Sequence, residues 1–166
     1  MNHTSPLSHR ESIEVTAPAE ELYDLVSDVT RTGDWSPICT ACWWDDPEQA
    51  GQVGAWFTGH NELPGHTWET RSQVVAARRG SEFAWVVGDG FVRWGFEMAA
   101  VEGGTELTDT WAFLPSGLTM FHERHGARAE AEIAARTEQA HTGIPQTLAA
   151  IKRIAEATQG RPLLNG

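Results

Sequence analysis

Polar and apolar residues alternate along several short stretches of the chain, and this two-residue period predicts β-strands. In the first stretch, SHRESIEVTAP, the polar residues Ser12, Glu14 and Thr16 alternate with Ile13 and Val15. Similar runs follow, separated by the segments ELPGH, ARRGS, VGDG and VEGGT, whose Gly and Pro residues favour turns. Short strands joined by tight turns are typical of an antiparallel meander. The later strands are expected near residues 40–45, 54–63, 66–77, 82–88, 91–101 and 104–114.

Two segments between the first and second strands have a helical character instead. APAEELYDLVSDV places Leu22, Val26 and Val29 on one face, and Pro18 stands where a first helical turn tolerates proline. The segment TRTGDWSPI predicts a second short helix or a turn. The chain is therefore expected to turn twice before it enters the meander.

The last third of the chain predicts a long helix. Residues 119–158 are rich in Ala, Glu, Arg and Gln, most of which favour helices, and Ile144, Leu148 and Ile151 fall on one face. Gly143 and Pro145 interrupt this pattern, so a kink or two abutting helices are expected there.

This order of elements predicts an α+β fold. A seven-stranded curved antiparallel sheet would wrap around the long C-terminal helix, with two short helices after the first strand. If the sheet curves strongly, it does not touch the helix along its whole length, and a cavity opens between them. The 166 residues are expected to form a single domain, 1–166, with its core at about 8–158.

Charge and composition exclude several classes of partner. The formal net charge of −11 argues against nucleic acid or an anionic membrane. No apolar run approaches the roughly 20 residues that a membrane span needs, and the start of the chain lacks the apolar stretch of a signal peptide. We therefore expect a cytoplasmic protein, either a monomer or a homodimer.

Several phrases of the sequence resemble the SRPBCC superfamily (START and pollen-allergen-like proteins), in particular its polyketide cyclase/dehydrase branch. The resemblance covers roughly residues 8–158 and implies a helix-grip fold with a deep hydrophobic cavity, but it names no ligand, since similar folds bind lipids, hormones and polyketides. The phrases that carry it are VTAPAEELYDLVSDVTRTGDWSP, VGAWFTGHN, HTWETRSQVVAARRGSEFAWVV, WGFEMAAVEGGTELTDTW and IPQTLAAIKRIAEA.

Alternation along the strands indicates which side chains face the helix. All eight tryptophans lie between Trp35 and Trp111, and several share a face with other apolar residues. Parity leaves the strand WFTGHNE ambiguous, and the family resemblance favours Phe57 and Asn61 inside. A filled aromatic core remains an alternative to a cavity that binds a flat aromatic or polycyclic molecule. The residues expected to bind such a ligand are Phe57, Trp68, Thr70, Ser72, Trp85, Trp94, Phe96, Trp111, Phe113 and Leu148.

Asp109 is the candidate acid or base, because it shares parity with the apolar residues Leu107, Trp111 and Phe113. Burial would raise its pKa toward the working range of general acid–base catalysis, and Asn61 would hold a substrate carbonyl or an attacking water. The alternative interpretation is that Asp109 bonds backbone amides or an indole and only fixes the sheet. The sequence thus leaves three functions open: a polyketide cyclase or dehydratase-type enzyme, a non-catalytic carrier or sensor of a hydrophobic molecule, and a protein-interaction module.

The motif Cys39-x-x-Cys42 is interpreted as two reduced structural thiols. Structural zinc requires four ligands and the chain has two cysteines, while a redox pair of this spacing normally opens a helix rather than leading into Trp43 and Trp44. No phosphate loop, nucleophile elbow or dinucleotide motif is present. We therefore expect neither a metal nor a cofactor.

Overall fold

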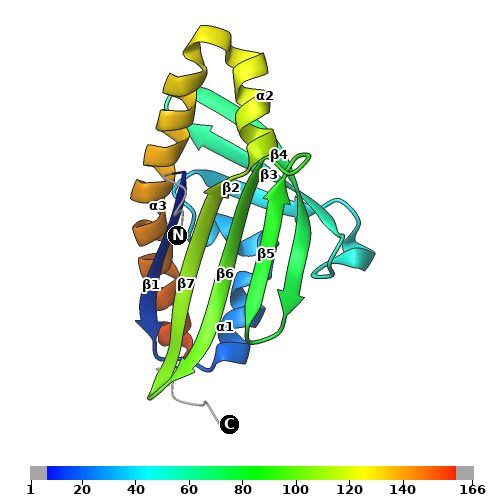
Figure 1. The fold of residues 1–166 in the computed structure, drawn as a ribbon. Coiled ribbons are helices and arrows are strands. Elements are labelled where there is room, and N and C mark those ends of the chain that lie inside the picture. The colour runs from blue at the N-terminus through cyan, green and yellow to red at the C-terminus, as the bar shows by residue number, and fades with distance from the viewer. Residues whose placement is uncertain (1–6, 160–166) are drawn as a thin grey trace.

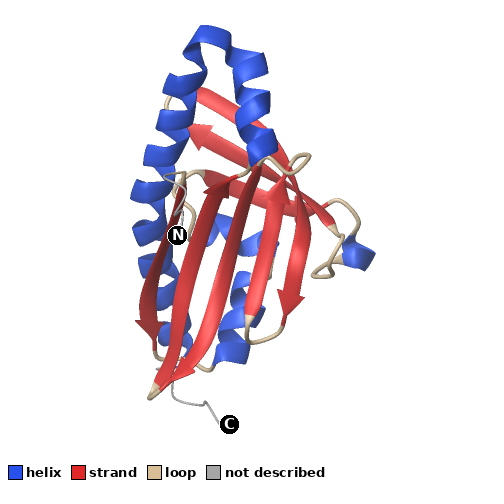
Figure 2. Cartoon of the chain, in the orientation of Figure 1, coloured by secondary structure: helices blue, strands red, loops and turns tan. Residues whose placement is uncertain are grey.

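The structure is a computed structural model that describes residues 7–159, and seven of its strands form one antiparallel sheet (Figures 1 and 2). Neighbouring strands follow the order β1-β7-β6-β5-β4-β3-β2, so only β1 leaves the sequential meander and pairs with the last strand. The predicted α+β fold, a curved antiparallel sheet with a long C-terminal helix, is confirmed. The strands are β1 (Ser8–Val15), β2 (Cys39–Trp44), β3 (Trp56–Leu63), β4 (His66–Arg78), β5 (Glu82–Val87), β6 (Val92–Val101) and β7 (Gly104–Phe113).

Two helical segments follow β1, as the sequence predicted, and two long helices follow β7. In Figure 1, α3 runs along one side of the curved sheet, while α2 and the first turns of α3 form a helical hairpin beyond one end of β7. The helices are α1 (Ala19–Val26), η1 (Val29–Asp34), η2 (Pro47–Gln49), α2 (Pro115–His125), η3 (Gly126–Arg128) and α3 (Ala129–Gln159).

The break between the terminal helices lies elsewhere than the sequence indicated. Helix α3 continues through Gly143 and Pro145, so the expectation of two abutting helices there is wrong. Pro145 is exposed, whereas Ile144 beside it is almost fully buried, and this packing outweighs the roughly 3 kcal/mol that an interior proline costs. The abutting helices meet instead at Gly126, whose φ of 54° suits a residue without a side chain.

The packed core lies where the sheet closes on α1 and on the C-terminal part of α3. Its most deeply buried side chains come from both layers and have 1% or less of their surface exposed; they include Leu22, Phe83, Leu107 and Ile151. Toward α2 the helices and the sheet separate, and the side chains between them no longer fill the space. The fold therefore combines a compact core at one end with a hollow at the other.

Candidate functional site

A cavity of about 610 Å³ lies between the inner face of the sheet and the helices. Strands β2 to β7 contribute one side of its lining, and η1, α2 and α3 contribute the other. This volume is typical of sites that hold small organic molecules. The lining residues Pro37, His66, Glu69, Arg71 and Arg124 are exposed, and we call this solvent-facing part of the lining the mouth.

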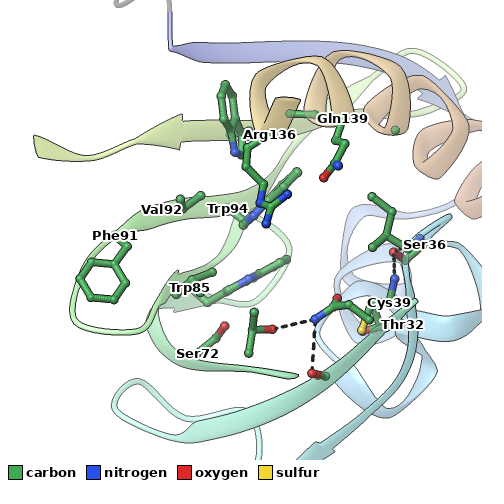
Figure 3. A pocket seen from close by; sticks show the side chains of 18 of the residues that line it. Thr32, Ser36, Cys39, Ser72, Trp85, Phe91, Val92, Trp94, Arg136 and Gln139 are labelled. Carbon is green, nitrogen blue, oxygen red and sulfur yellow. Dashed lines mark hydrogen bonds between the residues drawn. The ribbon is translucent and has the colours of Figure 1, made fainter. Parts of the chain in front are cut away.

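Three tryptophans from three adjacent strands form a row on the sheet side. Trp85 pairs in register with Trp94, and Trp94 pairs with Trp111. Residues directly opposite on neighbouring strands point to the same face, which is why the row forms. The Trp94 and Trp111 rings are 6.4 Å apart between centroids, and Figure 3 shows Trp85 and Trp94 beside the open space. The indoles thus border a void instead of filling it.

The structure brings together eleven of the twelve residues singled out from the sequence. Leu148 is the exception, since it is 3% exposed in the packed core and does not line the cavity. Ile144 and Thr147 still line the cavity, so the cavity ends just before Leu148. The eleven lining residues are Phe57, Asn61, Trp68, Thr70, Ser72, Trp85, Trp94, Phe96, Asp109, Trp111 and Phe113.

Polar groups gather on strands β3 and β4. The Asn61 amide is 8% exposed and donates to Thr70 Oγ1 and to the Trp68 carbonyl, each at 3.3 Å (Figure 3). Asn61 is therefore held in place by its neighbours, while its amide oxygen can still accept a hydrogen bond. Ser72 is buried farther along β4 and adds a hydroxyl to the same lining.

Asp109 lies on β7 with only 3% of its surface exposed. In register it stands between Phe96 on β6 and Glu11 on β1, and no ion pair reaches it from residues 7–159. Burial raises its pKa well above the usual value of an aspartate, and the nearby Glu11 carboxylate raises it further. A carboxyl group of this kind can act as a proton donor at a cavity wall.

Cys39 and Cys42 are both free thiols, and both line the cavity. A register shift between Cys39 and Ala41 places Cys39 opposite Asn61 and Cys42 opposite Gly59. This bulge lets two residues of odd separation face the same side. A hydrogen bond from the Cys42 thiol lowers the pKa of Cys39, while the same contact and burial raise the pKa of Cys42.

The helical side of the cavity holds residues that the sequence reasoning missed. Arg124 and His125 come from α2, and Arg136 and Gln139 come from α3. A signal existed for Arg136, because Arg136 and Ala140 precede Ile144 in steps of four and so continue the face of α3 that turns inward. Alternation along strands carries no information about a helical face, so it does not point to Arg136.

No cluster of three or more potential metal ligands occurs among residues 7–159. Over the same range, no helix is both long and apolar enough to cross a bilayer.

Comparison with known proteins places this cavity in a family context. The sequence pattern of the family described as "Polyketide cyclase / dehydrase and lipid transport" matches residues 6–142. The polyketide-cyclase-like protein of Corynebacterium glutamicum is 46% identical, with 96% of this chain and 98% of that chain covered and a TM-score of 0.69. Comparison with curated proteins gives no match.

Two more distant structures show the same fold. The di-domain ARO/CYC StfQ from the steffimycin biosynthetic pathway is 14% identical, with 93% of this chain and 52% of that chain covered and a TM-score of 0.68. Ara h 8.0201 is 15% identical, with 90% of this chain and 97% of that chain covered and a TM-score of 0.60. At these identities the likeness concerns the fold alone.

Proposed function

This chain belongs to the polyketide cyclase/dehydrase and lipid transport family, and we propose that it binds a flat aromatic or polycyclic small molecule in its internal cavity. The observation that carries the proposal is the row of Trp85, Trp94 and Trp111 beside an unfilled volume of about 610 Å³. Flat ligands stack on indoles, and Asn61 with Thr70 offers a polar group to orient them.

The cavity's composition favours an aromatic ligand over a simple alkyl chain. Aromatic rings from several strands surround the space, and their mutual contacts leave ring faces and edges available on its lining. The rings of Phe57 and Trp85 meet edge-on with 5.9 Å between their centroids, and those of Trp111 and Phe113 do so with 5.7 Å between theirs. A saturated chain would gain from burial here, but it would gain nothing from the ring geometry.

A titration with 1,8-dihydroxyanthraquinone, a neutral tricyclic probe, tests this proposal. Tryptophan fluorescence should be quenched saturably with one site per chain, and Trp94→Ala should weaken binding about tenfold, since an aromatic contact contributes roughly 0.5–1.5 kcal/mol beyond its buried area. Trp43→Ala is the matched control, because Trp43 is 42% exposed and lies outside the lining. Dodecanol, a saturated probe, should bind more weakly. Equal effects of the two substitutions would contradict the proposal.

A second function, cofactor-independent acid–base catalysis, is favoured by Asp109. This carboxyl group is buried, lines the cavity and has a raised pKa, as a general acid requires. Proton transfer at the carbon next to a carbonyl is the step shared by cyclisation and dehydration. In this account the ionised form of Asp109 takes a proton from that carbon and returns one to it, while the free amide oxygen of Asn61 accepts a hydrogen bond from a substrate hydroxyl group or a water. Without such turnover the protein would be a carrier or sensor of the same ligand.

Exchange of the α-hydrogens of 2-acetonaphthone in D₂O, followed by NMR, separates the enzyme from the carrier. The protein should accelerate exchange, and Asp109→Asn should lower that acceleration by about 10²–10⁴-fold, the usual contribution of a general acid or base. Binding of the ketone should persist in the variant, since Asn has nearly the same shape. Exchange at the buffer rate with the unaltered protein, together with saturable binding, would identify a carrier.

A further inference from the structure

Two arginines that line the cavity have no acidic partner among residues 7–159. They are Arg124 on α2 and Arg136 on α3. Every arginine of the sheet and its turns within that range is paired with a carboxylate, as are Arg31 of η1 and Lys152 of α3. Arg128 and Arg153 also have no acidic partner in that range, but they lie outside the lining. The paired arginines of the sheet and turns are Arg10, Arg71, Arg78, Arg79 and Arg93.

The other charged groups on the lining do not neutralise these two cations. Arg71 is held by Asp45 at 2.7 Å and stacks on Trp56, so its guanidinium is already engaged. Glu69 lies 3.8 Å from His60 Nδ1. Asp109 is buried on β7, and its pKa is raised by burial and by Glu11, an environment unlike that of a carboxylate paired with arginine.

Arg136 is the better placed of the two for contact with a ligand. It is half-buried, and its guanidinium lies 5.5 Å from the centre of the Trp68 ring, which itself stacks on His66. In Figure 3 its side chain reaches from α3 into the pocket toward Trp94, and Gln139 points into the same space. Arg124 is exposed and lies at the mouth.

We propose that Arg136, assisted by Arg124, binds the carboxylate of an amphipathic ligand whose aromatic body lies along the tryptophan row. A guanidinium presents a planar fork of N–H donors that matches a carboxylate, and such charge-assisted bonds are stronger where water is partly excluded. This inference rests on the proposed binding function and narrows its ligand to aromatic organic acids.

The charge of the whole protein gives the same arginines a second role. With a formal net charge of −11, the chain repels anions at long range. An anionic ligand therefore needs local positive charge where it enters, and Arg124 supplies that charge at the mouth. Arg136 then holds the carboxylate while the rings enter the apolar part of the cavity.

A matched pair of probes, 2-naphthoate and the neutral 2-naphthamide, tests this inference by NMR titration. The unaltered protein should prefer the naphthoate. Arg136→Gln should weaken naphthoate binding by about 10- to 100-fold, the equivalent of one hydrogen bond to a charged group. Binding of the naphthamide should weaken by a clearly smaller factor, since its neutral carbonyl group accepts a weaker hydrogen bond from the guanidinium than a carboxylate does. The affinity of Arg136→Lys for the naphthoate should lie between those of the unaltered protein and Arg136→Gln, because lysine keeps the charge and loses the planar fork of donors.

Arg153→Gln is the control, because Arg153 lies exposed on the same helix outside the lining and also has no acidic partner among residues 7–159. The inference is overturned if Arg136→Gln leaves naphthoate binding unchanged, or if Arg153→Gln weakens it equally. If the naphthamide binds in either case, the proposed function survives the loss of the inference. If neither probe binds at millimolar concentration, both fail. Melting temperatures of all variants establish that each is folded.

Discussion

Replacement of Asp109 by Asn should make the protein more stable at neutral pH, although it removes the carboxyl group of a buried residue. Asp109 is 3% exposed, and burial with the Glu11 carboxylate raises its pKa. Folding therefore favours the protonated carboxyl group. Asn has nearly the same shape and never ionises. The variant therefore avoids the free-energy cost that Asp109 imposes on the folded protein, which must either ionise a buried carboxyl group or keep it protonated.

The sign and size follow from proton linkage. Between the unfolded pKa of about 3.9 and the higher folded pKa, the unfolded chain has released this proton while the folded chain retains it. In that window the unfolding free energy falls by about 1.4 kcal/mol for each pH unit as pH rises, and above the folded pKa the loss is complete. For a chain of this length, that slope corresponds to about 3–5 °C in melting temperature per pH unit.

Denaturant unfolding of both proteins from pH 3 to pH 9 measures this effect. The difference between Asp109→Asn and the unaltered protein should be smallest at pH 3, grow as pH rises and then level off at the folded pKa. Taking the difference cancels the opposite contributions of Asp24, Asp45 and Glu156, whose pKa values are lowered by their partners. Glu11→Gln should narrow the pH range over which this difference grows without abolishing the growth, since burial is the larger cause of the raised pKa of Asp109. A difference that is independent of pH would refute the reasoning.

Two other predictions concern the cavity's edges. Cys39 should react with iodoacetamide faster than Cys42 near neutral pH. Cys42→Ala should slow the reaction of Cys39, because the donated hydrogen bond that lowers the pKa of Cys39 is lost, whereas Cys42→Ser retains a donor. Mass spectrometry of the alkylated peptides measures both rates, and equal reaction of Cys39 in the two variants would contradict the prediction. Gly117→Ala should destabilise the protein by roughly 1–3 kcal/mol, because an added methyl group would lie 2.0 Å from the Phe91 carbonyl oxygen. Gly143→Ala in α3 should stabilise it by up to about 1 kcal/mol, because the added methyl group meets only Pro37, at 3.5 Å. Equal melting temperatures of the two variants would contradict both predictions.

The sheet and its inward face were predictable because alternation is a local property of the sequence. Side chains two residues apart share a face, so the burial of Leu107, Asp109, Trp111 and Phe113 follows once β7 is recognised. The choice of Phe57 and Asn61 inside β3 needed the family resemblance, because both faces of that strand carry an aromatic ring.

The remaining features depend on spacing between layers, which no local pattern records. Leu148 lies on the correct face of α3, yet the helix already touches the sheet there, and the cavity ends before it. The bulge in β2 turns Cys39 and Cys42 toward the same side and reverses the parity expected of an unbroken strand. The steps of four that lead from Ile144 back to Arg136 are present in the sequence, but they do not record how far α3 stands from the tryptophan row.

The central claim is that the space beside Trp85, Trp94 and Trp111 is a binding site for a flat aromatic molecule. A crystal structure of the protein with 1,8-dihydroxyanthraquinone tests it most directly. The account predicts one molecule within the cavity, its rings against the tryptophan row and a polar atom within hydrogen-bond distance of Asn61 or Thr70. A cavity closed by rearranged indoles, or a ligand found only on the outer surface, would contradict it.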